Sequence, residues 1–234
     1  MVRLPLMLMV LLIAQLPASD AQAEIEARLD LTNRYIYRGI NLSDDDAALQ
    51  GRVEYATDLG FYAGMWASRA ESSYDDRNAQ VDYFAGYQRR LNRALALDAT
   101  LIRYTYTGGG VGDRYDWSEA QVTAHVRDHW SITAAVADDW YGWSGTTWSV
   151  ESSWYYAPAP RWMLDATLGH NAVTDAIGFD YRWAEIGFTR QLGAVHARLG
   201  FSATRGAPDL GELADDRWIV SVGWDLRRRG ASTR

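Results

Sequence analysis

The stretch AQVDYFAGY, residues 79–87, alternates apolar and polar side chains with a period of two. Successive side chains of an extended strand point to opposite faces, so this alternation gives one apolar face and one polar face. The apolar face would carry Ala79, Val81, Tyr83, Ala85 and Tyr87, and the polar face begins with Gln80 and Asp82. The stretch therefore predicts a β-strand that borders an apolar phase on one side only.

The same alternation recurs from Glu24 to the end of the chain. Clear runs lie at 25–31, 49–55, 120–126, 148–154, 162–168, 195–203 and 218–226, and less regular runs lie at 60–68, 95–106, 130–137 and 181–190. Together with 79–87 they predict about twelve strands, with about ten or about fourteen as alternatives.

The connections between these runs alternate in length. Short ones lie at 57–60, 88–94, 127–129, 157–160 and 191–194, and longer polar ones lie at 39–47, 69–78, 107–116, 138–146, 171–179 and 205–216. This alternation is typical of barrels whose short turns face the periplasm and whose long loops face outward. We therefore predict an all-β fold, a transmembrane antiparallel up-and-down β-barrel with both termini periplasmic.

The two ends of the chain differ from the middle. Arg3, the apolar run 4–16 and the small residues at 21–23 predict a secretory signal peptide over residues 1–23. The barrel would then span 24–226, followed by an Arg-rich tail over 227–234. The chain has no cysteine and a net charge of -7 with scattered arginines, so neither disulfides nor a nucleic-acid partner is expected.

The chain is rich in aromatic residues, with eleven Trp and fourteen Tyr. In a membrane barrel, Trp and Tyr gather at the two membrane interfaces. The sequence predicts one such belt beside the long loops and another beside the short turns. The belt beside the long loops would hold Trp117, Trp140, Trp143, Trp148, Trp183 and Trp218, together with Tyr35 and Tyr37 at the end of the first strand. The belt beside the short turns would hold Trp130, Trp154, Trp162 and Trp224.

Charged residues fall on the strand face opposite the apolar one, which suits a water-filled lumen. A soluble β-sandwich or lipocalin-like barrel is the alternative, and it would turn the apolar face inward. The candidate lumen residues are Arg28, Asp30, Arg34, Arg52, Glu54, Asp82, Glu119, Glu151, Asp165, Glu185 and Arg198.

Acidic residues concentrate in the long loops, whereas the short turns hold Arg89, Arg90, Arg93 and Arg127. An acidic extracellular mouth would concentrate cations. Solvation of the loops, or divalent ions that bridge lipopolysaccharide, would explain the same acids. A specific metal site at 44–46 is not expected, because the spacing of a calcium loop is missing. The mouth residues are Asp44, Asp45, Asp46, Asp75, Asp76, Asp138, Asp139, Asp215 and Asp216.

One segment resembles a known family. Residues 33–68, NRYIYRGINLSDDDAALQGRVEYATDLGFYAGMWAS, contain an NRYxxRG entry, an SDxxxAxQG hairpin and a GFYxGxWAS strand. This segment closely resembles the first part of the TorF family of bacterial porins. The resemblance implies an outer-membrane β-barrel and brings no catalytic residues. The chain departs from the usual aromatic end of such barrels, which the barrel-assembly machinery reads, because it ends in RRRGASTR.

The four histidines, His125, His129, His170 and His196, do not predict catalysis, because no GxSxG elbow occurs and no Ser partner is evident. No enzyme activity, cofactor or metal is expected. We expect an exported outer-membrane channel for passive diffusion of small polar solutes or ions, with weak cation preference. Lipid, lipopolysaccharide and the assembly machinery are its expected partners. The alternative is a non-conducting surface barrel whose loops bind a partner or an envelope component.

Overall fold

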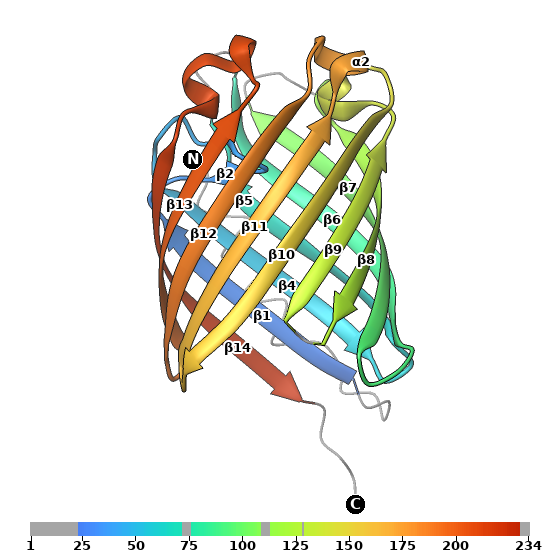
Figure 1. Ribbon diagram of the computed structural model, residues 1–234, viewed down its shortest axis with the longest axis vertical. Coiled ribbons are helices and arrows are strands. Elements are labelled where there is room, and N and C mark those ends of the chain that lie inside the picture. The colour runs from blue at the N-terminus through green and yellow to red at the C-terminus, as the bar shows by residue number, and fades with distance from the viewer. Residues whose placement is uncertain (1–22, 72–75, 109–112, 128, 230–234) are drawn as a thin grey trace, which may run out of the picture.

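The computed structural model describes residues 23–71, 76–108, 113–127 and 129–229. Twelve of its strands form one closed barrel, in which every neighbouring pair is antiparallel and β1 pairs with both β4 and β14 (Figure 1). The strands are β1 (Ala23–Thr32), β4 (Ala48–Thr57), β5 (Phe61–Arg69), β6 (Arg77–Arg90), β7 (Leu95–Gly108), β8 (Trp117–Val126), β9 (Trp130–Ala137), β10 (Thr147–Ala159), β11 (Trp162–Ala172), β12 (Tyr181–Leu192), β13 (Val195–Arg205) and β14 (Arg217–Arg229).

This architecture confirms the predicted up-and-down barrel and the predicted strand number. The predicted signal peptide lies outside the described residues, apart from Ala23. At the other end, β14 continues to Arg229, past the predicted boundary at 226, and residues 230–234 lie outside the described part.

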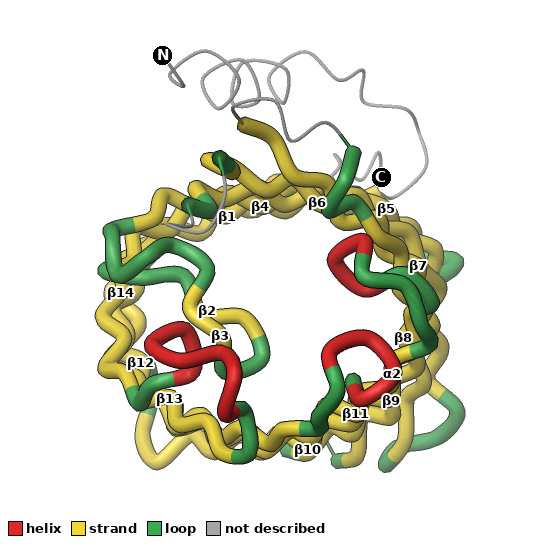
Figure 2. Tube along the Cα trace, turned by 90° about the horizontal axis from the view of Figure 1, so that it is seen from above, coloured by secondary structure: helices red, strands yellow, loops and turns green. Residues whose placement is uncertain are grey.

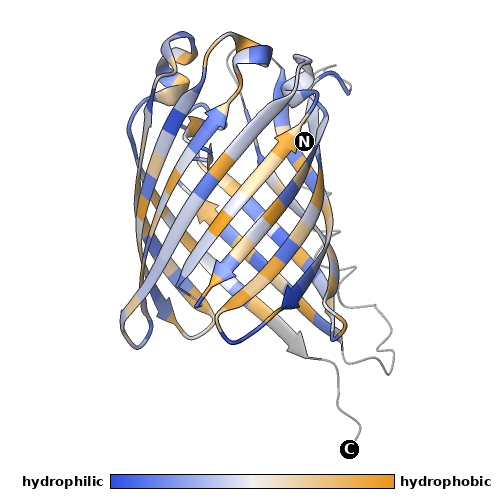
Figure 3. Cartoon of the chain, turned by 45° about the vertical axis from the view of Figure 1, so that its right-hand side comes forward, coloured by the Kyte–Doolittle hydropathy of each residue, from blue (hydrophilic) through white to orange (hydrophobic). Residues whose placement is uncertain are grey.

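The orientation of the two strand faces decides between a membrane barrel and a soluble one. The apolar face of the predicted strands lies on the outside of the barrel and is exposed. The exposed fraction of the side chain is 67% for Leu101 and 66% for Leu168. Apolar and polar residues alternate along the wall in Figure 3. An exterior of this kind requires lipid as its neighbour, so the soluble alternative is wrong. No helix of the described residues is long and apolar enough to cross a membrane.

The remaining elements gather at the long-loop end. They are the hairpin strands β2 (Ile36–Tyr37) and β3 (Ile40–Asn41), the helix α2 (Thr174–Ile177), and the 3-10 turns η1 (Trp140–Gly142) and η2 (Pro208–Ala214). Seen from above, the hairpin and the helical turns lie within the ring of strands (Figure 2). The long connections therefore cover this end of the barrel from inside.

The segment 33–47, which we call the plug, folds into the lumen. Its tip is a two-residue turn in which Arg38 and Gly39 have φ of 47° and 77°. A turn with positive φ at both positions fits the twist of a tight hairpin. Behind the tip, the Tyr35 amide donates to Ser43 Oγ at 2.8 Å, and the Ser43 hydroxyl donates to the Asp46 carbonyl at 2.8 Å.

The position of the plug corrects the prediction that 39–47 is a polar loop in outside water. Ile40, Asn41, Leu42 and Ser43 are buried, and only the end of the segment, with Asp44, Asp45 and Asp46, is exposed. The physical reason is that the residues on either side of the tip include Tyr35, Ile40 and Leu42, whose apolar side chains are stabilised by burial in the aromatic interior.

An aromatic core packs around the plug at the long-loop end of the barrel. Tyr104 and Trp117 stack with ring centroids 3.9 Å apart, and Trp140, Tyr181 and Trp183 belong to the same cluster. The predicted outer aromatic belt was therefore wrong for Trp117, Trp140, Trp183, Tyr35 and Tyr37, which lie inside.

The parity of the strands explains this correction. Trp117 and Trp183 each stand two residues before an inward acid, Glu119 and Glu185, so the alternation places them on the inner face. The other tryptophans of the predicted belts keep exposed rings, except for the half-buried Trp162, which stacks on Phe188. These exposed residues are Trp130, Trp143, Trp148, Trp154, Trp218 and Trp224.

Candidate functional site

The interior wall carries the predicted lumen charges. The strand register places ten of them on the face opposite the exposed apolar rows: Arg28, Asp30, Arg52, Glu54, Asp82, Glu119, Glu151, Asp165, Glu185 and Arg198. Arg34 lies beyond the end of β1, and its Nη1 donates to the Trp218 carbonyl at 2.9 Å. Most of these charges meet opposite charges across or along strands.

One charge network joins β1, β13 and β14. Arg28 donates from Nε and Nη2 to Asp30 at 2.7 and 3.0 Å. The buried His196 lies with Nε2 at 2.7 Å from Asp30 and Nδ1 at 3.1 Å from Asp225. The imidazole therefore holds two carboxylates of neighbouring strands on the inner wall.

A second network joins β11, β12 and β13. Arg198 Nη2 donates to Asp165 at 2.6 Å and to Glu185 at 2.8 Å. All three side chains are less than a quarter exposed. This part of the wall thus carries one guanidinium between two carboxylates.

The tip of the plug makes the most buried arginine–carboxylate pair among the described residues, between Arg38 and Glu119. Arg38 donates to Glu119 from Nη1 at 2.6 Å and Nη2 at 3.0 Å, and to Glu151 from Nε at 2.6 Å. The side chains of Arg38 and Glu119 are 7% and 3% exposed. Glu119 belongs to β8 and Glu151 to β10, the strands that flank β9 on the far side of the barrel from β1. The plug therefore crosses the lumen from its root to the opposite wall.

Further contacts fix the plug around the circumference. Tyr35 Oη donates to Gln80 on β6 at 3.3 Å, and the Tyr37 and Tyr104 hydroxyls lie 3.0 Å apart. Thr204 on β13 donates to the Gly39 carbonyl at 2.7 Å. The tip touches this wall so closely that a Cβ at Gly39 would lie 2.2 Å from Thr204 Oγ1.

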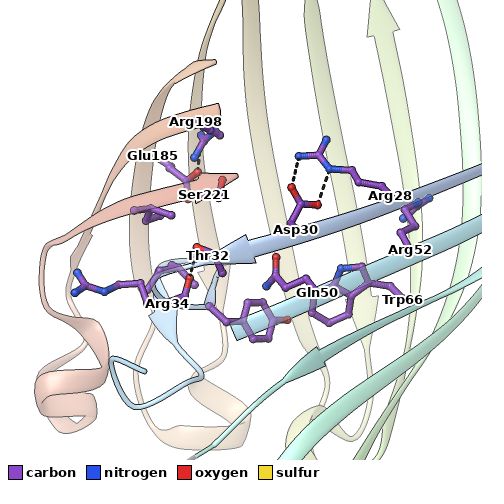
Figure 4. A pocket seen from close by; sticks show the side chains of 13 residues that line it. Arg28, Asp30, Thr32, Arg34, Gln50, Arg52, Trp66, Glu185, Arg198 and Ser221 are labelled. Atoms are coloured by element: carbon purple, nitrogen blue, oxygen red, sulfur yellow. Dashed lines mark hydrogen bonds and ion pairs between the residues drawn. The ribbon is translucent and has the colours of Figure 1, made fainter. Parts of the chain in front are cut away.

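Two hollows run beside and below the plug. The first, of about 390 Å³, lies between the plug root and the wall, and its lining includes Arg28, Arg34, Arg52, Trp66 and Arg198 (Figure 4). The second, of about 270 Å³, extends to the short-turn rim at Thr57 and Gly60. Both are lined by Arg52. They therefore lie next to each other along the inner wall, the first against the plug root and the second at the short-turn end.

The acidic mouth is more neutral than its sequence suggests. Asp45 pairs with Arg34 at 3.3 Å and with Arg217 at 2.8 Å, and Asp46 pairs with Arg69 at 3.0 Å. These arginines stand at or near strand ends, where the mouth begins, and the composition of the loops alone does not reveal them as partners of the acids.

The remaining mouth residues are placed as follows. Asp215 pairs with Arg217 at 3.3 Å, and the hydrogen bond from Arg205 lowers the pKa of Asp216. Asp76, Asp138 and Asp139 are exposed, and Asp139 accepts the Ser144 amide at 3.0 Å. Asp75 lies outside the described residues. Within the described ranges, no three His, Asp or Glu side chains are grouped to hold a metal ion.

Comparison with solved structures gives the fold. The KdgM porin in complex with disordered oligogalacturonate matches with a TM-score of 0.56 and 9% identity, over 86% of this chain and 98% of that chain. The COG4313 outer membrane channel from Pseudomonas putida F1 matches with a TM-score of 0.52 and 13% identity, over 91% of this chain and 97% of that one. At such low identities the likeness shows the fold of outer-membrane channels.

Among curated protein sequences, none matches this chain significantly. A family profile matches residues 17–205, most of the chain. The chain therefore belongs to the family described as "Bacterial protein of unknown function (Gcw_chp)".

Proposed function

We propose that this protein is a porin-like channel of the bacterial outer membrane, exported by a signal peptide, through which small polar solutes or ions diffuse passively. The observation that carries the proposal is the pair of hollows on the inner wall, which share Arg52 and lie at the plug root and at the short-turn rim. The fold of outer-membrane channels and the resemblance to the TorF porins support it. Outer-membrane lipid, lipopolysaccharide and the assembly machinery are the proposed partners, and no catalytic step is assigned.

The plug makes the proposed passage narrow, because it occupies the centre of the lumen and leaves space along the β1 and β4 wall. Size is then the first filter and the charged wall is the second. A weak cation preference would depend mainly on Asp76 and Asp138, since Asp45, Asp46 and Asp215 have arginine partners.

The second candidate is a non-conducting surface barrel, and the buried Arg38 contacts favour it because they fix the plug in the lumen. Reconstitution of the mature protein in a planar bilayer separates the two. The channel predicts small unitary conductance steps, and a salt gradient across the bilayer gives the sign of the ion preference. A bilayer that contains folded protein and stays silent over repeated insertions would support the non-conducting barrel.

A further inference from the structure

The arginines at the two rims of the barrel differ in their partners. At the long-loop end, Arg103 pairs with Asp116 at 3.5 Å and Arg217 pairs with Asp45 at 2.8 Å. At the short-turn end, five exposed arginines form no ion pair with another described residue, and the described part of the five short turns holds a single acid, Asp58. This rim therefore has an excess of positive charge among the described residues. The five arginines are Arg89, Arg93, Arg127, Arg161 and Arg190.

Arg190 lies on the outer wall beside two stacked aromatic rings. Along β12, Ile186, Phe188 and Arg190 are exposed on the face that borders lipid. Arg190 is directly opposite Trp162 of β11 in the register, and its guanidinium carbon lies 4.5 Å from the centre of the Trp162 ring. Trp162 stacks on Phe188, with ring centroids 4.6 Å apart. The cation is therefore held at a defined place at the edge of an apolar surface.

A similar arrangement occurs on the opposite side of the ring, at β5 and β6. Phe61 and Tyr87 are 58% and 37% exposed, and their ring centroids lie 4.8 Å apart. Arg89 follows Tyr87 by two residues within β6, so the alternation puts its side chain on the same outer face, nearer the rim. Each of these two aromatic pairs thus has an outward arginine beside it at the short-turn end.

These positions match the depth of lipid headgroups. Aromatic rings mark the membrane interface, and arginine side chains extend along apolar surface to keep the charged group in the polar layer. A guanidinium fork binds phosphate oxygens with two parallel hydrogen bonds. Because Arg89 and Arg190 have no carboxylate partner among the described residues, their donors are available to a headgroup.

We propose that the short-turn rim binds anionic phospholipids, with one headgroup phosphate at Arg190 beside Trp162 and another at Arg89 beside Tyr87. Lipid is the occupant that the geometry favours, because both arginines lie on the same outer face as the exposed apolar rows. The inference rests on the proposed outer-membrane location. It implies that the basic rim fixes the height of the barrel in the leaflet next to the short turns.

The test is native mass spectrometry of the folded barrel, released from detergent after incubation with phosphatidylglycerol or phosphatidylcholine. Wild type should retain phosphatidylglycerol in preference to phosphatidylcholine. The double variant R89Q/R190Q should bind phosphatidylglycerol roughly tenfold or more weakly, because each arginine near an anionic surface contributes roughly fivefold. R190K keeps the charge but loses the fork, and it should weaken binding less than R190Q.

The matched control is R103Q, which removes an outward arginine that already has a carboxylate partner. It should retain phosphatidylglycerol like wild type, and circular dichroism confirms that each variant is folded. Equal retention of the two lipids by wild type, or equal retention of phosphatidylglycerol by wild type, R103Q and R89Q/R190Q, would overturn the assignment. Lipid-free dimers that dissociate in R89Q/R190Q would also overturn it, because the rim would then bind a second copy of the chain.

The same proteins in a planar bilayer keep this inference separate from the proposed channel. Unitary conductance without preference for phosphatidylglycerol refutes the lipid surface and leaves the channel standing. Silent bilayers with phosphatidylglycerol retained refute the channel and leave the lipid surface standing.

Discussion

Arg38 at the tip of the plug is the residue whose loss should change the lumen most. Arg38→Gln removes the cation that Glu119 and Glu151 share inside the barrel. Glutamine can still donate to one carboxylate, but it cannot offer the three donors that Arg38 uses. The variant therefore leaves two acids facing each other across β9 without a counter-charge.

The magnitude follows from the burial of this group. Removing one partner of a buried ion pair costs about 3–5 kcal/mol, because the remaining charge stays buried without compensation. We expect the plug to leave the lumen without unfolding of the barrel, because β2 and β3 pair with each other and not with the barrel strands, and water would then hydrate Glu119 and Glu151. We expect most of the cost to appear as plug opening, which shifts the closed-to-open ratio by roughly a hundredfold or more.

Single-channel recording measures this shift directly. Arg38→Gln should show larger or longer openings than wild type, whereas denaturant unfolding of the barrel should change less than the full cost of the lost pair. Arg69→Gln is the control, because Arg69 and Asp46 pair at the mouth with 38% and 61% of their side chains exposed. An exposed pair contributes about 0–1 kcal/mol, so this variant should conduct like wild type.

A second variant separates charge from shape. Arg38→Gln combined with Glu119→Gln removes the uncompensated carboxylate at the most buried position, and it should restore part of the closed state. If Arg38→Gln gives the same conductance trace as wild type and Arg69→Gln, the plug is not held by its ion pairs, and this reasoning is refuted.

Three other predictions concern the tip, the outer wall and the long-loop end. Gly39→Ala should destabilise the plug by more than Gly178→Ala, because both glycines have positive φ but only a Cβ at Gly39 meets neighbours within 4 Å. Proteolysis of the plug in the folded barrel checks this, and equal cleavage of the two variants would contradict it. Leu101→Arg, on the exposed apolar face, should cost about 2–4 kcal/mol in lipid vesicles, and Thr133→Arg, on the inner face, should cost much less. Equal losses for the two, measured by denaturant unfolding, would mean that the faces are assigned wrongly. The hydrogen bonds from Thr174 lower the pKa of Asp180, so their stabilising effect is present above the ordinary aspartate pKa and is lost as pH falls through the lowered value. NMR of the Thr174 amide should show a transition below about pH 4 that is absent in Asp180→Asn, and a transition above pH 5 would count against it.

The local pattern of the chain was enough to predict the barrel. Runs such as 79–87 and 218–226 alternate with a period of two, and the same parity separates inward from outward residues along these strands. The predicted lumen charges on the strands, such as Asp165 and Arg198, followed from that parity alone. Trp117 and Trp183 were predicted for the outer belt because they lie near the long loops. Their positions in the alternation place both side chains on the inner face, where they are buried.

The plug could not be predicted in the same way. The segment 33–47 has the composition of a surface loop, with three consecutive aspartates, and nothing in its local pattern shows that its tip turns inward. Its partners are far away in the chain, since Arg38 meets Glu119 and Glu151, and Gly39 meets Thr204. The mouth acids Asp46 and Asp45 pair with Arg69 and Arg217, which are also distant in the chain, so the sequence alone could not predict these pairs.

The sequence by itself predicted about twelve strands and the apolar face that these strands turn to lipid, because both depend on side-chain alternation between neighbouring residues; closure of the barrel fixed the number at twelve. Only the tertiary structure decided what occupies the lumen, because closure of the barrel brings distant strands around one segment and lets Arg38 reach carboxylates on the opposite wall. The first hollow has the same origin, since the register of β1 against β4 places Arg28 and Arg52 together in its lining.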